Sequence, residues 1–261
     1  MKLNTWRIHN KERLTVTNHP MINLLRRIRR NMMTEKKSDL YLVYAVGEVV
    51  LVVMGILIAL QIDNWNKAKN LHRTEMLLLI EMKSNLEDSM AEAQWNITYN
   101  KEKLNANEVV LENLNSPGSY NDTLNFYYAN LWGGSYFSKN TSAYDNLKSL
   151  GFHIIENDSL RIRITELYSN RFAYIDLLES NFIDNFYSLR LEPLILSHII
   201  TDTMWISAKP VNQSKLAMNH EFKEAIKKNI GWIRYMIDIY VNIETEIVNL
   251  IHQIESEINH L

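Results

Sequence analysis

The sequence predicts an all-α membrane protein, with one N-terminal transmembrane helix and an external bundle of long helices that contains an insert of short helices and loops. Three observations predict this class. A long apolar run lies near the N-terminus, at residues 40–62. The 261 residues include only 7 Gly and 4 Pro, too few turn-forming residues for a many-stranded β fold. Isoleucines recur at helical spacing along the last forty or so residues.

The first element is a basic tail, residues 1–39. It carries ten Lys and Arg against three acidic residues, a net charge of +7, whereas the remaining chain carries a net charge of −9. Basic segments that flank a membrane helix stay in the cytoplasm. The cluster at Arg26–Arg30 therefore predicts contact with anionic lipid, and no nucleic-acid partner is expected.

The second element is the transmembrane helix, residues 40–62. Its sequence, LYLVYAVGEVVLVVMGILIALQI, contains one formal charge, at Glu48. At about 1.5 Å per residue the helix rises roughly 34 Å, enough for the hydrocarbon core of about 30 Å. A cleaved signal peptide is the alternative, but this run is longer than a typical signal core, and Ala59-Leu60-Gln61 is a poor cleavage site. We predict an uncleaved signal anchor.

The flanks of this helix predict its direction. The basic flank precedes the helix, so the N-terminus is expected in the cytoplasm and residues 63–261 outside it. Tyr41 and Tyr44 fit the inner aromatic belt, and Trp65 fits the outer one.

One face of the predicted membrane helix is richer in small and polar residues than the others. It is formed at steps of three and four by Ala45, Glu48, Val52, Gly55 and Ala59. Gly55 and Ala59 form a small-xxx-small pair, which permits close helix approach, and a carboxylate within a bilayer needs a partner or a proton. The stripe predicts self-association or docking to another membrane protein. A position of Glu48 near the inner interface and an ion pathway are the alternatives.

The third element is a helical domain, residues 63–261. Its first part lacks Gly and Pro up to Ser116-Pro117-Gly118, so we expect the membrane helix to continue to about residue 115. Residues 117–157 predict two short helices with loops. Their aromatic side chains are expected to fill a core, and a ligand pocket is the alternative.

The second half of the domain begins with Asn157, which predicts an N-cap for a helix reaching about residue 190. Glu192-Pro193 predicts a further short helix to about 200, and a loop containing Pro210 follows.

The last predicted helix runs from Asn219 to Leu261. Its apolar stripe alternates steps of four and three through Ile226, Ile230, Ile233, Ile237, Tyr240, Ile247, Ile251, Ile254 and Ile258. Such a stripe predicts packing against more than one other helix, in the same chain or in other subunits. Glu244 interrupts it, either as a carboxylate at the edge of the core or as a contact that specifies a partner.

The sequence contains no catalytic motif. It lacks cysteine, a phosphate-binding loop, the HExxH zinc motif and a nucleophile elbow. His252 and Glu255 share a helix face, but one such pair does not make a metal site. No catalytic, cofactor-binding or metal-binding residue is predicted, and the protein is not expected to be an enzyme.

The stretch YAVGEVVLVVMGILIALQIDNWN, Tyr44–Asn66, resembles the N-terminus of an uncharacterised family of single-pass inner-membrane proteins from Bacteroidetes. The resemblance implies an inner-membrane location with the C-terminal domain in the periplasm, and it implies no activity. Met21 resembles the usual start of that family. Residues 1–20 are therefore predicted to be a disordered extension.

Four Asp-Ser or Asp-Thr pairs, each followed by an apolar residue, resemble the sequon of periplasmic O-glycosylation in Bacteroidetes. Their hydroxyl residues are Ser89, Thr123, Ser159 and Thr203. The alternative is that these pairs start helices.

These observations together predict a non-enzymatic, membrane-anchored periplasmic protein for interaction, scaffolding or accessory assembly. Its expected partners are the lipid bilayer and either a second copy or another membrane protein. The alternative is a sensor-like domain that binds a ligand in the aromatic region and acts through a membrane partner.

Overall fold

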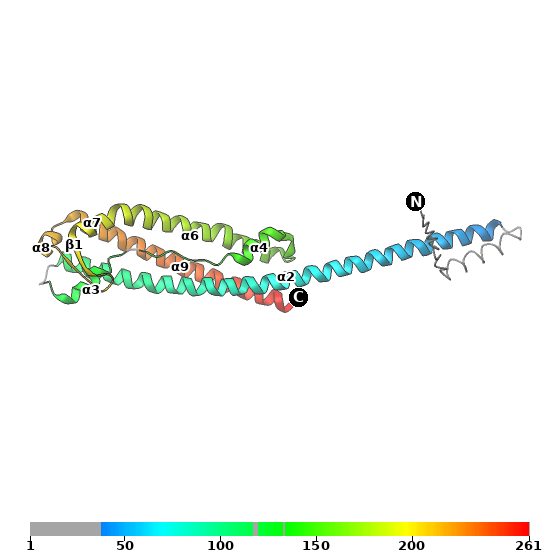
Figure 1. The fold of residues 1–261 in the computed structure, drawn as a ribbon, viewed down its shortest axis with the longest axis horizontal. Coiled ribbons are helices and arrows are strands. Elements are labelled where there is room, and N and C mark those ends of the chain that lie inside the picture. The colour runs from blue at the N-terminus through cyan, green and yellow to red at the C-terminus, as the bar shows by residue number, and fades with distance from the viewer. Residues whose placement is uncertain (1–37, 117–119, 133, 261) are drawn as a thin grey trace, which may run out of the picture. The chain divides into compact units, whose positions relative to one another are not determined.

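The computed structural model describes residues 38–116, 120–132 and 134–260, almost all of them helical (Figure 1). The predicted extension, residues 1–20, and nearly all of the predicted tail lie outside the described residues. The chain divides into two units, Met1–Lys67 and Ala68–Leu261, and each is considered separately below.

Helix α2, Ser38–Asn115, contains both the apolar run and the first part of the predicted domain without a break. Its apolar part is long and hydrophobic enough to cross a membrane, and no residue of its most apolar stretch is buried. Apolar side chains such as Leu42 and Leu51 are exposed on it. A helix that is apolar on all sides suits a lipid environment. The prediction of one long apolar helix is thus confirmed, while its direction stays a prediction.

The second unit is a bundle of three long helical stretches (Figure 1). The first is α2 from Ala68 onward, and the third is α9 (His220–His260). The second consists of consecutive helices: α5 (Asp158–Glu166), η3 (Leu167–Arg171), α6 (Phe172–Glu179), η4 (Ser180–Leu191) and α7 (Glu192–His198). The predicted start at Asn157 is confirmed, because its side-chain oxygen accepts a hydrogen bond from Leu160 N at 3.1 Å. Asn219 caps α9 in the same way, accepting from Phe222 N at 3.0 Å.

The isoleucine stripe of α9 packs inside the chain's own bundle. Ile226, Ile233, Ile247 and Ile254 are fully buried. The buried face is wider than a coiled-coil seam, since residues beside the stripe are buried too: Phe222, Asn229, Met236, Ile243 and Leu250. Glu244 is half-buried at the edge of the core and accepts a hydrogen bond from Gln94 of α2 at 2.7 Å.

Two stretches of the second long helix, η3 and η4, are π-helical, with wider turns than an α-helix. The buried residues around η4 recur at steps of four: Ile175, Glu179, Ile183, Tyr187 and Leu191. In an α-helix such a row drifts around the axis in one direction, and in a π-helix it drifts in the opposite direction, so the alternation of the two keeps the row on one side. Helical structure here continues to His198, as the prediction of a second short helix implied.

The insert contains the expected short helices, η1 (Asp122–Leu124), α3 (Asn125–Ala129), α4 (Ser142–Leu150) and η2 (Phe152–Ile154). The expectation of a loop around Pro210 is wrong, and with it a strictly all-α class. Strands β1 (Ile199–Thr203) and β2 (Ser207–Pro210) form an antiparallel hairpin, followed by the short helix α8 (Gln213–Ala217). The β-branched run in β1 favours a strand, and Pro210 lies at the end of β2, where a missing N–H is tolerated.

Candidate functional site

The predicted contact stripe of the membrane helix is exposed along its whole length. Ala45, Glu48, Val52, Gly55 and Ala59 all face away from protein atoms in the described residues, and a Cβ added at Gly55 would meet nothing within 4 Å. The aromatic residues Tyr41, Tyr44 and Trp65 are exposed as well. The stripe is exposed to lipid or to another chain, and which of the two it meets stays a prediction.

The domain contains a partly buried chain segment without regular structure, residues Gly134–Thr141, here called the strap, in which Gly134 and Phe137 are buried. Ser135 of the strap bonds to Asn96 and Asn100 of α2, while Ser142, just after it, bonds to Asn85. These partners lie about 20 Å apart along α2 at 1.5 Å per residue. Seven residues cover that length only if the chain is nearly extended.

Side chains from the three long helices satisfy the backbone of the strap. Ser135 O accepts from the Tyr240 hydroxyl of α9 at 3.0 Å, and Phe137 N donates to Glu179 Oε1 of α6 at 2.8 Å. Asn140 N donates to the Ser89 hydroxyl of α2 at 3.2 Å. A buried segment outside any ladder must bond its N–H and C=O groups to side chains. The strap therefore explains why polar residues occupy the core.

Sequence reasoning missed these polar positions. Asn96, Asn100, Lys103 and Asn107 recur at steps of four, three and four on the buried face of α2. This helical spacing of polar residues was the signal in the sequence that could have identified the positions. Asn107 in turn accepts from Asn229 of α9 at 2.9 Å, which joins the two helices directly.

Among the acidic residues that bond to the strap, Glu179 has the most strongly shifted pKa, and only 2% of its surface is exposed. Burial raises its pKa to about 7, against the hydrogen bonds from Tyr240 and Phe137, which favour the ionised form. The Tyr240 hydroxyl donates to Glu179 Oε1 at 2.7 Å, and burial raises the pKa of Tyr240 strongly. The closed surroundings keep solvent from this pair, so its evident role is to hold the strap.

Lys103 is a cation in the core, with 4% exposure and a neutral partner. Its Nζ donates to Asn130 Oδ1 at 2.6 Å and lies 4.7 Å from the ring centroids of both Tyr99 and Trp205. Burial lowers the pKa of the ammonium group. Asn130 also donates to Trp205 O at 2.9 Å, so this cluster fastens the turn of the β hairpin to α2. Trp205 has a φ of 66°, an unusual conformation for a bulky residue.

Gly134 lets the strap pass close to η4. Its φ is +92°, and an added Cβ would lie 2.9 Å from Phe182 Cε1 and 3.0 Å from Ile183 Cγ1. A larger residue would need both a strained backbone and displaced core side chains.

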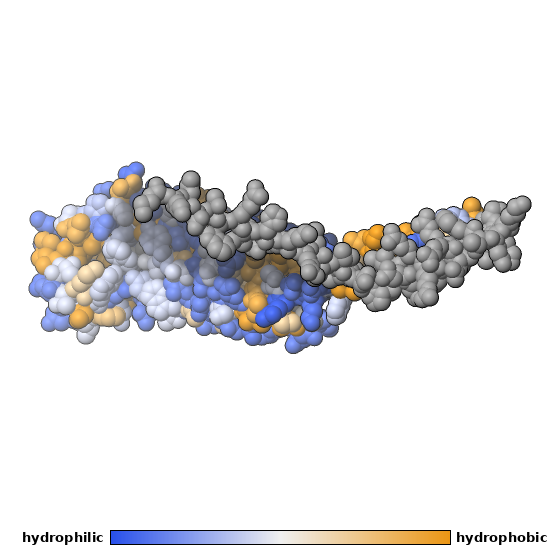
Figure 2. All heavy atoms as spheres, turned by 45° about the vertical axis from the view of Figure 1, so that its right-hand side comes forward, coloured by the Kyte–Doolittle hydropathy of each residue, from blue (hydrophilic) through white to orange (hydrophobic). Residues whose placement is uncertain are grey.

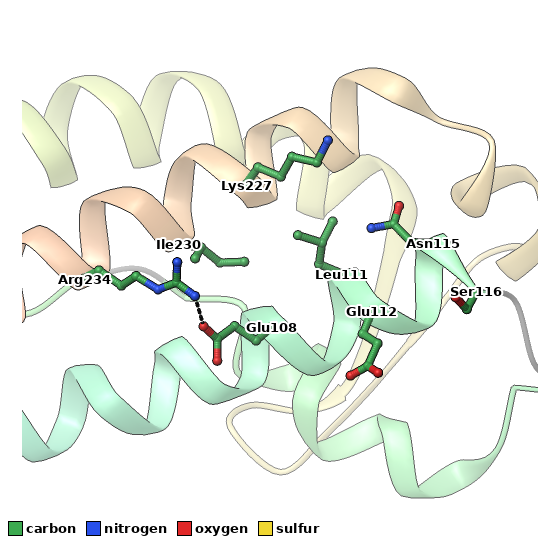
Figure 3. A pocket seen from close by; sticks show the side chains of 8 residues that line it. All are labelled: Glu108, Leu111, Glu112, Asn115, Ser116, Lys227, Ile230 and Arg234. Carbon is green, nitrogen blue, oxygen red and sulfur yellow. Dashed lines mark hydrogen bonds and ion pairs between the residues drawn. The ribbon is translucent and has the colours of Figure 1, made fainter.

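An open cleft lies between the end of α2 and the start of α9 (Figure 3). Its volume is about 590 Å³, and Glu108, Glu112, Lys227 and Arg234 contribute charges of both signs to its wall. Arg234 pairs with Glu108 across it. Small-molecule sites are mostly enclosed and apolar, and this cleft is neither.

Most aromatic residues of the insert pack into the core, and none of them lines this cleft, whereas Phe126 and Tyr136 are exposed. Tyr128, Phe137 and Tyr144 are buried. Trp132 and Phe152 pack against the same core. Tyr144 stacks on Tyr168 of η3 with ring centroids 4.6 Å apart. These contacts agree with the expectation that the aromatic side chains fill a core, and the ligand-pocket alternative stays a prediction.

The four sequon hydroxyls lie in different surroundings. Ser89 is fully buried and its hydroxyl donates to Asn85 O at 2.8 Å, so it is inaccessible in the folded domain. Thr123, Ser159 and Thr203 are exposed. Glycosylation of the folded protein therefore remains a prediction for these three.

Large exposed apolar side chains gather on α7, the β hairpin and α8, at the left-hand end of the domain in Figure 2. Leu196 is 76% exposed and Met218 78% exposed. This surface, here called the apolar end, consists of Leu196, Ile200, Met204, Trp205, Ile206, Val211 and Met218. Apolar side chains that gather on an exposed surface are typical of interaction sites.

The comparisons with known proteins point to a single family. The model described as "Family of unknown function (DUF6090)" matches residues 48–191, which run from the apolar part of α2 to the end of η4. No curated protein and no solved structure matches the chain. The matched range includes the strap and the polar residues of α2 and α6 that hold it.

Proposed function

The chain belongs to the DUF6090 family of unknown function, and from this premise we propose that it is a non-enzymatic, membrane-anchored interaction or scaffold protein. The apolar part of α2 holds it in a bacterial inner membrane, with its N-terminus in the cytoplasm and its helical domain in the periplasm. The basic flank before residue 40 and the apolar character of the segment support this topology.

The apolar end is the observation that carries the interaction role. Polar side chains such as Glu179 and Tyr240 in the interior bond to the strap, and most aromatic residues of the insert pack in the core. The apolar end, in contrast, exposes side chains that water solvates poorly. A protein partner that covers this surface gains the free energy of burying it.

The membrane stripe offers a second contact within the same role. Glu48, Gly55 and Ala59 lie on one face of α2, where a second copy or another membrane protein can approach closely. The membrane stripe and the apolar end are both surfaces expected of a membrane-anchored protein that assembles with other proteins.

Affinity purification of the intact protein from cross-linked native membranes tests this proposal. We expect a stoichiometric partner that is lost in the triple variant Leu196→Glu, Ile206→Glu, Met218→Glu, because three charges oppose burial of the apolar end. The control triple variant Leu77→Glu, Ile162→Glu, Leu177→Glu changes equally exposed positions elsewhere and should keep the partner. Absence of any stoichiometric partner, or equal capture by both variants, would refute the assignment.

A further inference from the structure

Three potential metal ligands meet where α2 passes the loop before α5. His72 and Glu75 lie three residues apart on α2, and Glu156 lies in the loop between η2 and α5. His72 Nδ1 is 4.0 Å from Glu75 Oε2 and 4.0 Å from Glu156 Oε1. One ligand atom from each residue falls within 4.8 Å of the others.

Glu75 is fully buried, and only one of its two carboxylate oxygens has a partner. Oε1 accepts from Glu156 N at 2.9 Å. Oε2, the oxygen beside His72, accepts no hydrogen bond within the described part of the chain. A buried carboxylate oxygen without a partner is costly.

Like charges add to this cost. Burial raises the pKa of Glu75, and the charges of Glu156 and Glu257 raise it further. Glu257 belongs to α9, so acidic groups from this helix and from the loop before α5 act on one buried carboxylate of α2. A bound cation would neutralise them together.

We propose that His72, Glu75 and Glu156 bind a divalent cation of the zinc type. An imidazole nitrogen in the set favours zinc over calcium or magnesium, which prefer oxygen ligands alone. Tetrahedral zinc with bonds of about 2.0–2.1 Å needs ligand atoms about 3.4 Å apart. The two 4.0 Å separations must shorten by about 0.6 Å and no separation by more than about 1.4 Å, which the half-exposed side chains of His72 and Glu156 can provide by moving toward Glu75.

The proposed metal has a structural consequence. His72 and Glu75 belong to the part of α2 that begins the domain, whereas Glu156 directly precedes the cap of α5. Zinc would tie these two elements together close to residue 62, where the predicted membrane segment ends. Three protein ligands leave a fourth position for water or for Glu257.

The chain offers a matched control in His252 and Glu255 of α9. This pair has the same spacing, with His252 Nδ1 3.5 Å from Glu255 Oε2. Lys83 already pairs with Glu255 at 2.7 Å, and the His252 side chain is 69% exposed and that of Glu255 is 40% exposed. The pair therefore lacks the orphaned buried oxygen that distinguishes Glu75.

Zinc titration of the full-length, untagged protein in detergent, after removal of metals with a chelator, tests the site. We expect one zinc ion per chain by calorimetry and a rise in the Tm on adding zinc. His72→Ala and Glu156→Gln, both at half-exposed positions, should weaken zinc affinity at least tenfold, whereas His252→Ala should leave it unchanged. No zinc binding by the unaltered protein, or equal affinity in His72→Ala, would overturn the proposal.

Discussion

Replacing Glu179 by Gln should change how the stability of the domain depends on pH. Glu179 accepts hydrogen bonds from Phe137 N at 2.8 Å and from the Tyr240 hydroxyl at 2.7 Å through the same oxygen. Gln keeps an acceptor at that position and cannot ionise. The variant therefore removes the charge while it retains both contacts.

The size of the effect follows from the pKa of Glu179, which burial raises from 4.5 to about 7. Between these values the native state keeps a proton that the unfolded state releases, so the free energy of unfolding falls as pH rises. A shift of this size corresponds to about 3 kcal/mol, since one pKa unit is about 1.4 kcal/mol. This stability is fully present below about pH 4.5 and is lost as pH rises through 7.

Urea unfolding of the full-length protein in detergent, followed by tryptophan fluorescence at pH 5 and pH 8, measures this effect. We expect the stability of Glu179→Gln relative to the unaltered protein to increase by about 2.5 kcal/mol from pH 5 to pH 8. Titration of Glu75, whose pKa is also raised, occurs in both proteins and cancels in this difference. A relative stability that does not change with pH would refute the reasoning.

Three further predictions follow from the strap and the membrane stripe. Gly134→Ala should destabilise the domain by about 2–4 kcal/mol in the same urea assay, because of its positive φ and the close contact with Phe182, whereas Gly231→Ala, at a position with open space, should not destabilise it. Tyr240→Phe should cost about 2 kcal/mol, since the Ser135 carbonyl and Glu179 lose their donor; an unchanged urea midpoint would contradict the role of this hydroxyl. Glu48→Leu should change the oligomeric state or the partner captured in mild detergent, as measured by light scattering, and an unchanged assembly would favour a position of Glu48 at the membrane interface.

Local patterns in the sequence were sufficient for the long helices. The cap at Asn157, the end of α2 before Pro117 and the isoleucine stripe of α9 each depend on residues within a few positions of one another. The hairpin at residues 199–210 was missed because its strands are short, and its turn depends on Lys103 and Asn130, which are distant in the sequence.

The sequence by itself determined that this protein has one long apolar helix followed by a helical domain, because periodicity and hydropathy are properties of neighbouring residues. Only the tertiary structure decided what the polar residues of α2 do. The partner of Asn100 lies 35 residues away and that of Asn107 lies 122 residues away. The same holds for His72 and Glu156, which come together only when the loop before α5 packs on α2. The spacing of the polar residues of α2 indicates that they share one helix face, but it does not identify their partners, because a hydrogen bond or a metal ligand set depends on distance in space.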